Sequence, residues 1–139
     1  MKISATLIIS GDLLVPDEIT KILNITPHVS RRKGDVKVFK SKKSIVAKFG
    51  LWEWRSRDPS GTFTVNDHVA AIANTFAHVC DELGKLPKAE NAWIDLHFVA
   101  GDNAEDASSV VFLISPEMIA ALCKIGLPVE ITVDALSLA

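Results

Sequence analysis

The sequence predicts a single α+β domain over residues 1–139, with a mostly antiparallel sheet of about six strands and three helices in the order β-α-β-β-α-β-β-α-β. Three observations lead to this prediction. The length of 139 residues suits one domain. Segments in which apolar residues alternate with a period of two, as in strands, are interspersed with segments that have the helical period. Strands and helices mixed in this way favour one sheet with helices on one face.

The composition excludes wholesale disorder and a membrane-spanning protein. Hydrophobic residues make up 48% of the chain and charged residues 23%, as in ordinary globular domains. No uncharged stretch approaches the roughly 20 apolar residues that cross a bilayer. The N-terminal apolar run is short and lacks the cleavage site of a signal peptide, so we expect a cytoplasmic protein with no membrane association. Cys80 and Cys123 lie in or beside apolar helical stripes and are expected to be free, buried thiols.

The N-terminal half is predicted to contain a strand over residues 2–10, a helix from Pro16 to near Asn24, strands over residues 35–40 and 45–57, and a turn at residues 58–61. Proline in the first helical turn, followed by two acidic residues near the positive end of the helix dipole, favours the helix start. Alternation of apolar and polar residues favours the last strand. The sequence Asp-Pro-Ser-Gly at residues 58–61 is typical of a turn.

The C-terminal half is predicted to contain a long helix over residues 65–83, strands over residues 93–100, 110–114 and 127–133, a loop over residues 101–106, and a helix from Pro116 to Gly126. The long helix has the clearest signal, because its apolar residues fall on one stripe at 100° per residue. Thr64 and Asp67 resemble a capping box at its start, and Gly84 is placed to end it. Ser115 is the expected N-cap of the last helix.

Two parts of the chain resemble each other. Residues 16–27 and 116–128 each begin with Pro and an acidic residue, and their apolar residues coincide at three helical positions. Both follow a predicted strand, which suggests two strand-helix-strand halves related by pseudo-symmetry. The alternative is that the same capping chemistry and helical period arose twice independently.

Charge is distributed very unevenly along the chain. Residues 31–57 contain ten basic and two acidic residues, a net charge of +8, whereas the remaining residues carry a net charge of −10. Aromatic residues Phe39, Phe49, Trp52 and Trp54 lie among the basic ones. Such a segment is suited to an acidic protein surface, or to holding phosphates while stacking on bases. The alternative is a solvated hairpin whose lysines protect an exposed edge, with both tryptophans in the core.

The candidate binding residues are the cations of this segment together with its tryptophans: Arg31, Arg32, Lys33, Lys37, Lys40, Lys42, Lys43, Trp52, Trp54, Arg55 and Arg57. The sharpest local cluster is Arg-Arg-Lys-Gly-Asp at residues 31–35, in which Gly34 permits a positive φ and backbone N–H groups can approach an anion. The alternative is a simple turn between a helix and a hairpin.

Catalytic, cofactor and metal-binding motifs are absent from the sequence. There is no phosphate loop, dinucleotide fingerprint, His-Glu-x-x-His or Cys-x-x-Cys spacing, so no cofactor, metal or catalytic residue is assigned. Asp95 and His97 share a strand face and are suited to an acid–imidazole pair, near which Arg55 completes the one candidate enzyme centre. Glu130 and Asp134 share a face of the last strand. The alternative for all of them is a solvated sheet face.

Six short motifs resemble, in order and spacing, those of a bacterial family known as domain of unknown function 4279. They are Ser10-Gly11-Asp12, the helix start at residues 16–19, the helix end at residues 23–27, Arg32-Lys33-Gly34-Asp35, Leu51-Trp52-Glu53, and the Ser-Pro-Glu helix followed by Gly-Leu and an apolar strand at residues 115–133. The resemblance spans nearly the whole chain. It implies a single compact bacterial domain and assigns no catalytic residues.

The function predicted from these observations is that of a non-catalytic binding module, immunity-like or accessory, whose basic hairpin contacts an acidic protein surface. A nucleic-acid-binding protein that uses the same segment is the alternative. An enzyme of unknown reaction, centred on Arg55, Asp95 and His97, is the third hypothesis.

Overall fold

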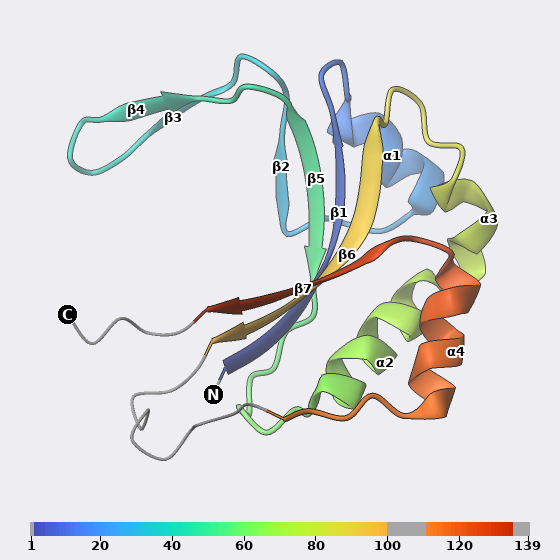
Figure 1. Ribbon diagram of the computed structural model, residues 1–139. Helices are drawn as coiled ribbons and strands as arrows, with labels where there is room; N and C mark the ends of the chain where they lie inside the picture. Colours follow the sequence, from blue (N-terminus) through green and yellow to red (C-terminus); the bar gives the residue numbers. More distant parts are fainter. Residues whose placement is uncertain (1, 100–110, 135–139) are drawn as a thin grey trace.

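The computed structural model describes residues 2–99 and 111–134, which form one α+β domain (Figure 1). The strands are β1 (Lys2–Gly11), β2 (Val29–Arg31), β3 (Val36–Val38), β4 (Ser44–Val46), β5 (Gly50–Arg55), β6 (Asn91–Val99) and β7 (Val129–Asp134). The helices are α1 (Pro16–Leu23), α2 (Val65–Phe76), α3 (Cys80–Leu83) and α4 (Pro116–Ile125), with a 3-10 turn at Ala77–Val79. The predicted fold class is confirmed.

The main sheet has five strands in the order β2-β5-β1-β6-β7. Every neighbouring pair is antiparallel except β6 and β7, which are parallel. Strands β3 and β4 form a separate antiparallel hairpin, which projects away from the main sheet (Figure 1). The sheet is therefore mostly antiparallel, as predicted, but part of the basic segment forms a two-stranded hairpin outside it, while residues 50–55 form β5 within it.

The core lies between one face of the main sheet and the helices. Alternate residues of β1 and β6 point into it and are fully buried: Ala5, Leu7, Ile9, Ile94, Leu96 and Phe98. Trp52 of β5 contacts two helices, because its indole N–H donates to Thr20 Oγ1 of α1 at 3.1 Å and its ring meets the edge of Phe76 of α2. The helices therefore cover the same face of the sheet, and the opposite face is open.

The predicted caps explain where the helices begin and end. The Thr64 side chain accepts from the Asp67 backbone N–H, while Asp67 accepts from the Thr64 N–H, a complete capping box. Ser115 caps α4 through the Met118 N–H at 3.2 Å. Asn24 and Gly126 end their helices in the left-handed conformation.

The predicted helix over residues 65–83 is interrupted. Phe76 has φ −105° and ψ 0°, and Val79 has φ −125° and ψ 16°, so the chain passes through a 3-10 turn between α2 and α3. Thr75 Oγ1 donates to the Ala71 carbonyl at 2.8 Å, a bond that favours bending of a helix. The buried stripe continues through Val79 and Leu83 despite the break, which is why periodicity alone did not reveal it.

Two of the predicted strands require correction. The strand expected over residues 45–57 is two strands, β4 and β5, because the chain leaves the hairpin at residues 47–49 before it enters the main sheet. Residues 111–114 are not a strand, although Phe112 and Ile114 pack partly against the core and the Phe112 ring stacks on Phe98. Val110 and the predicted loop over residues 101–106 lie outside the described residues.

The two similar segments occupy related positions. Helix α1 follows β1 and helix α4 follows β6, the central antiparallel pair of the sheet. The relation ends at the next strand, since β1 has the antiparallel β5 beside it whereas β6 has the parallel β7. The two halves therefore share the order of one strand and one helix, but the strand that follows differs: β2 does not pair with β1, whereas β7 pairs with β6.

Both cysteines are free thiols, as predicted, but their burial differs. Cys80 is half-buried, and its thiol donates to the carbonyl oxygens of Phe76 and Ala77. Cys123 is exposed rather than buried, because it lies on the solvent side of α4 between the buried Leu122 and Ile125.

No helix within residues 2–99 and 111–134 is long and apolar enough to span a membrane.

Candidate binding surface

The greater part of the basic segment forms an arm, which we define as residues 32–49. Its hairpin ladder pairs Val36 with Val46, and hydrogen bonds between the backbones of Gly34, Asp35 and Ala47 extend it toward the main sheet. At the tip the Phe39 N–H donates to the Lys43 carbonyl at 2.8 Å. The arm is thus a continuous hydrogen-bonded structure that stands out from the domain (Figure 1).

The cluster at residues 31–35 forms the turn at the base of the arm. The Asp35 carboxylate accepts from the Arg32 backbone N–H at 2.7 Å, and Gly34 has φ +92°, a conformation that favours glycine. Lys33 Nζ lies 2.9 Å from Asp12 Oδ2, just beyond β1. This exposed ion pair joins the base of the arm to the domain. In the structure the cluster is thus a turn between β2 and the hairpin.

Most of the candidate cations lie on the arm among exposed apolar side chains. Arg32, Lys33, Lys37, Lys40, Lys42 and Lys43 are exposed and belong to the arm, and Arg31 lies in the adjacent strand β2. The exposed apolar residues of the arm, between 39% and 68% accessible, are Val36, Val38, Phe39, Ile45, Val46 and Phe49. Exposed apolar patches mark interaction sites, and this hairpin presents six exposed apolar side chains among its cations.

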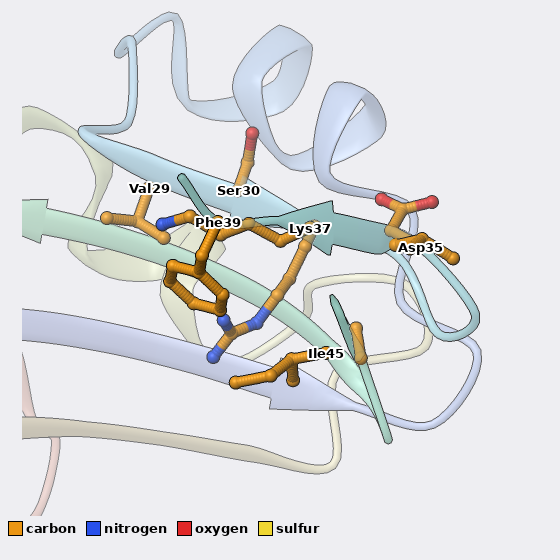
Figure 2. Close-up of a pocket in the computed structure, with 9 residues that line it drawn as sticks. Val29, Ser30, Asp35, Lys37, Phe39 and Ile45 are labelled. Carbon is orange, nitrogen blue, oxygen red and sulfur yellow. The ribbon is translucent and has the colours of Figure 1, made fainter. Parts of the chain in front are cut away.

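A groove of about 500 Å³ lies between β2 and the arm (Figure 2). Its lining residues are Val29, Ser30, Arg31, Asp35, Val36, Lys37, Phe39, Ile45 and Ala47. The Lys37 ammonium lies 5.4 Å from the centre of the Phe39 ring, within reach of a cation–π interaction. The groove therefore combines aromatic, aliphatic and cationic surface.

The two candidate tryptophans point into the domain. Trp52 is completely buried. Trp54 is half-buried, with the edge of Phe76 at 5.6 Å and the His28 ring at 5.6 Å between ring centres. Trp52 is therefore a core residue, and neither ring belongs to the arm.

Arg55 and Arg57 lie far from the arm. Strand β5 begins at Gly50, beside the arm, and ends at Arg55, about 17 Å away, with Arg57 two residues beyond. The Arg55 backbone N–H donates to His28 Nδ1 at 2.8 Å. Burial, with the nearby Arg57 and Arg55 charges, holds the pKa of His28 below its ordinary value. The structure thus divides the candidate residues between two surfaces.

The second surface is a depression of about 540 Å³ on the open face of the sheet, lined by Ser4, Thr6, Ile8, Glu53, Arg55, Ser56, Arg57, Asp95 and His97. Arg55, Asp95 and His97, the candidate enzyme centre, all line it. The strand register places Thr6 directly between Arg55 and Asp95.

The acid–imidazole pair predicted between Asp95 and His97 is wrong. His97 Nε2 lies 2.7 Å from Asp134 Oδ2, and Asp95 accepts from Thr132 Oγ1 at 3.0 Å. The cause is the parallel register of β6 and β7, which places Thr132 opposite His97 on the same sheet face. Arg55 is paired in turn with Glu53 at 3.0 Å. Each charged group of this candidate centre is therefore held by a neighbour.

A buried pair, Ser56 and His68, was not predicted from the sequence. Ser56 Oγ lies 2.8 Å from His68 Nδ1, and both residues are buried. They border a further cavity of about 460 Å³ that also contains Asp58, Phe63 and His97 among its lining. The only sequence signal was the position of His68 near the edge of the apolar stripe. The partner is 12 residues away, beyond a turn, and no local pattern indicates it.

Stability should fall as the pH is lowered through about 6.5 because of His68. Burial lowers the pKa of His68, while the Asp58 and Asp67 carboxylates partly oppose this effect. The unfolded chain, with a histidine pKa of about 6.5, therefore binds a proton before the folded chain does, and stability rises with pH across this range.

The measurement is the free energy of unfolding in urea at pH 7.5 and 5.5 for the wild type and His68→Gln. We expect the wild type to lose more stability than the variant when the pH is lowered. His28 titrates in both proteins, so the difference between them reports His68. An equal loss in the two proteins would contradict the assignment.

No group of three or more metal-ligating side chains occurs in the part of the chain that the structure describes.

Comparison with known proteins identifies the chain at the level of a family. No curated protein and no solved structure matches the sequence. The family model for Domain of unknown function (DUF4279) matches residues 1–136, nearly the whole chain, so this protein belongs to that family.

Proposed function

We propose that this protein is a non-catalytic binding module, of the immunity-like or accessory kind, whose arm contacts an acidic surface of a protein partner in the bacterial cytoplasm. The observation that carries the proposal is the concentration of cations and exposed apolar side chains on one projecting hairpin of a chain that is otherwise acidic. Two free thiols are typical of a reducing compartment.

The arm is suited to a protein partner in two ways. Its lysines attract acidic surfaces at long range and speed encounter, and its valine, isoleucine and phenylalanine side chains provide apolar area for a tight contact. Nucleic acid is the alternative partner, because a basic surface also attracts phosphate groups. The buried Trp52 offers no ring face for stacking on a base, and the exposed aliphatic side chains of Val38, Ile45 and Val46 favour a protein partner over single-stranded nucleic acid.

Site-specific photo-cross-linking tests the proposal. The photoreactive residue p-benzoylphenylalanine replaces Phe49 on the arm, which is 44% exposed, and in a matched control replaces Ile119 on α4, which is 51% exposed. Irradiation of host cells should join a protein with an acidic surface to the Phe49 variant and not to the Ile119 variant. Adducts that contain only nucleic acid, or no adduct from Phe49, would overturn the proposal.

A further inference from the structure

Strand β2 forms one edge of the main sheet. It pairs with β5 on one side, and among the described residues no strand pairs with its other side. An edge strand with unpaired backbone groups is a template for an added strand. The arm stands beside this edge, but its two strands pair only with each other.

The groove between β2 and the arm lies along this free edge. Val29 and Arg31 share one face of β2 because side chains alternate along a strand, and Figure 2 shows Ser30 directed to the other side from Phe39. Phe39, Ile45 and Ala47 contribute apolar surface from the arm. An added strand would present every second side chain to this surface.

The charge of the groove and the free edge of β2 indicate which kind of partner segment would bind there. Arg31 and Lys37 line the groove, and the base of the arm adds Arg32 and Lys33, so acidic side chains are favoured there. An extended segment pairs its backbone groups with an edge strand about 4.8 Å away, whereas the backbone groups of a helix are bonded within the helix. An extended segment therefore fits these observations better than a helix.

We propose that the groove binds an extended acidic segment of the partner, which adds as a strand to the free edge of β2 and places apolar and acidic side chains, at every second position, against Phe39, Ile45 and Lys37. This inference rests on the proposed function and specifies how the partner is recognised. Main-chain hydrogen bonds to an edge strand supply affinity in this mode, and the alternating side chains supply specificity.

Selection from a phage-displayed library of random 12-residue peptides tests the inference. The selected peptides should contain acidic and apolar residues with a spacing of two. They should bind the Val38→Ala variant as well as the wild type, since Val38 is 68% exposed and does not line the groove. The groove variants Phe39→Ala and Lys37→Glu should each bind at least tenfold more weakly.

Amide hydrogen exchange supplies a second readout. Binding of a selected peptide should slow, at least tenfold, those amides of residues 29–31 that exchange freely in the unbound protein. Three results would overturn the inference: peptides that bind the groove variants as tightly as the wild type, selected residues with a helical spacing, or β2 amides whose exchange is unchanged by the peptide. In each case an acidic protein cross-linked through Phe49 would leave the proposed function standing, so the two failures are distinguishable.

Discussion

Replacing Trp52 by alanine is expected to lower the free energy of unfolding by about 3–5 kcal/mol. Trp52 is completely buried and is the largest of the fully buried side chains. Its ring meets the edge of the Phe76 ring, with 6.2 Å between the ring centres, and its N–H donates to Thr20 Oγ1. Removal of the indole leaves a cavity between β5, α1 and α2. Thr20 of α1 and Phe76 of α2 each lose their contact with it.

Urea unfolding measures this loss, and Trp93→Ala is the matched control. Trp93 lies half-buried on β6, so the same truncation there should cost less. At temperatures where Trp52→Ala remains folded, its affinity for the partner should stay within twofold of the wild type, because Trp52 is not on the arm. A loss of stability below about 1 kcal/mol would contradict the core assignment.

Replacing Gly50 by alanine is expected to destabilise the protein by about 1–3 kcal/mol. Gly50 is the point at which the chain passes from the arm into β5. A Cβ atom there would lie 2.7 Å from Leu14 Cβ, 2.8 Å from the Leu14 carbonyl oxygen and 2.9 Å from the Gly11 carbonyl oxygen. Two of these neighbours are backbone atoms, which cannot move aside without disturbing the end of β1 and the turn that follows it.

Gly84→Ala is the matched control, because a Cβ atom at Gly84 meets nothing within 4 Å and its φ is −86°. This variant should be as stable as the wild type or slightly more stable. The comparison is made by urea unfolding of both variants. Equal stabilities of Gly50→Ala and Gly84→Ala would show that the chain has more room at the base of the arm than the structure indicates.

The sequence predicted elements whose signals are local. The caps at Thr64, Ser115 and Gly126 involve residues three or four positions apart, and the buried alternation of β6 needs only its own pattern. These predictions are confirmed because the physical causes lie within one turn of helix or one strand.

Errors arose where tertiary contacts decide the structure. The division of residues 45–57 into β4 and β5 follows from their different partners, since β4 pairs with β3 whereas β5 pairs with β1 and β2. The three residues of β2 are too few to show alternation. Residues 111–114 are all apolar, which is typical of a buried strand, but both sides of β6 are already paired, with β1 and with β7.

The candidate site was predictable only in part for the same reason. The cations of the arm are contiguous in sequence, so the hairpin brings them together. Arg55 and Arg57 belong to the same charged window but lie at the other end of β5. The pairing of His97 with Asp134 follows from the parallel register of β6 and β7, which residue patterns did not indicate.

The most direct test of the central claim is the affinity of the cross-linked partner for three forms of the protein. They are the wild type, an arm variant with Lys40, Lys42 and Lys43 changed to Glu, and a body variant with Lys21, Lys85 and Lys124 changed to Glu. All six lysines are exposed, so the two variants change net charge equally. We expect the arm variant to bind at least tenfold more weakly, and the affinity of the wild type to fall as salt is added. Equal weakening by both variants, or none by the arm variant, would contradict the account.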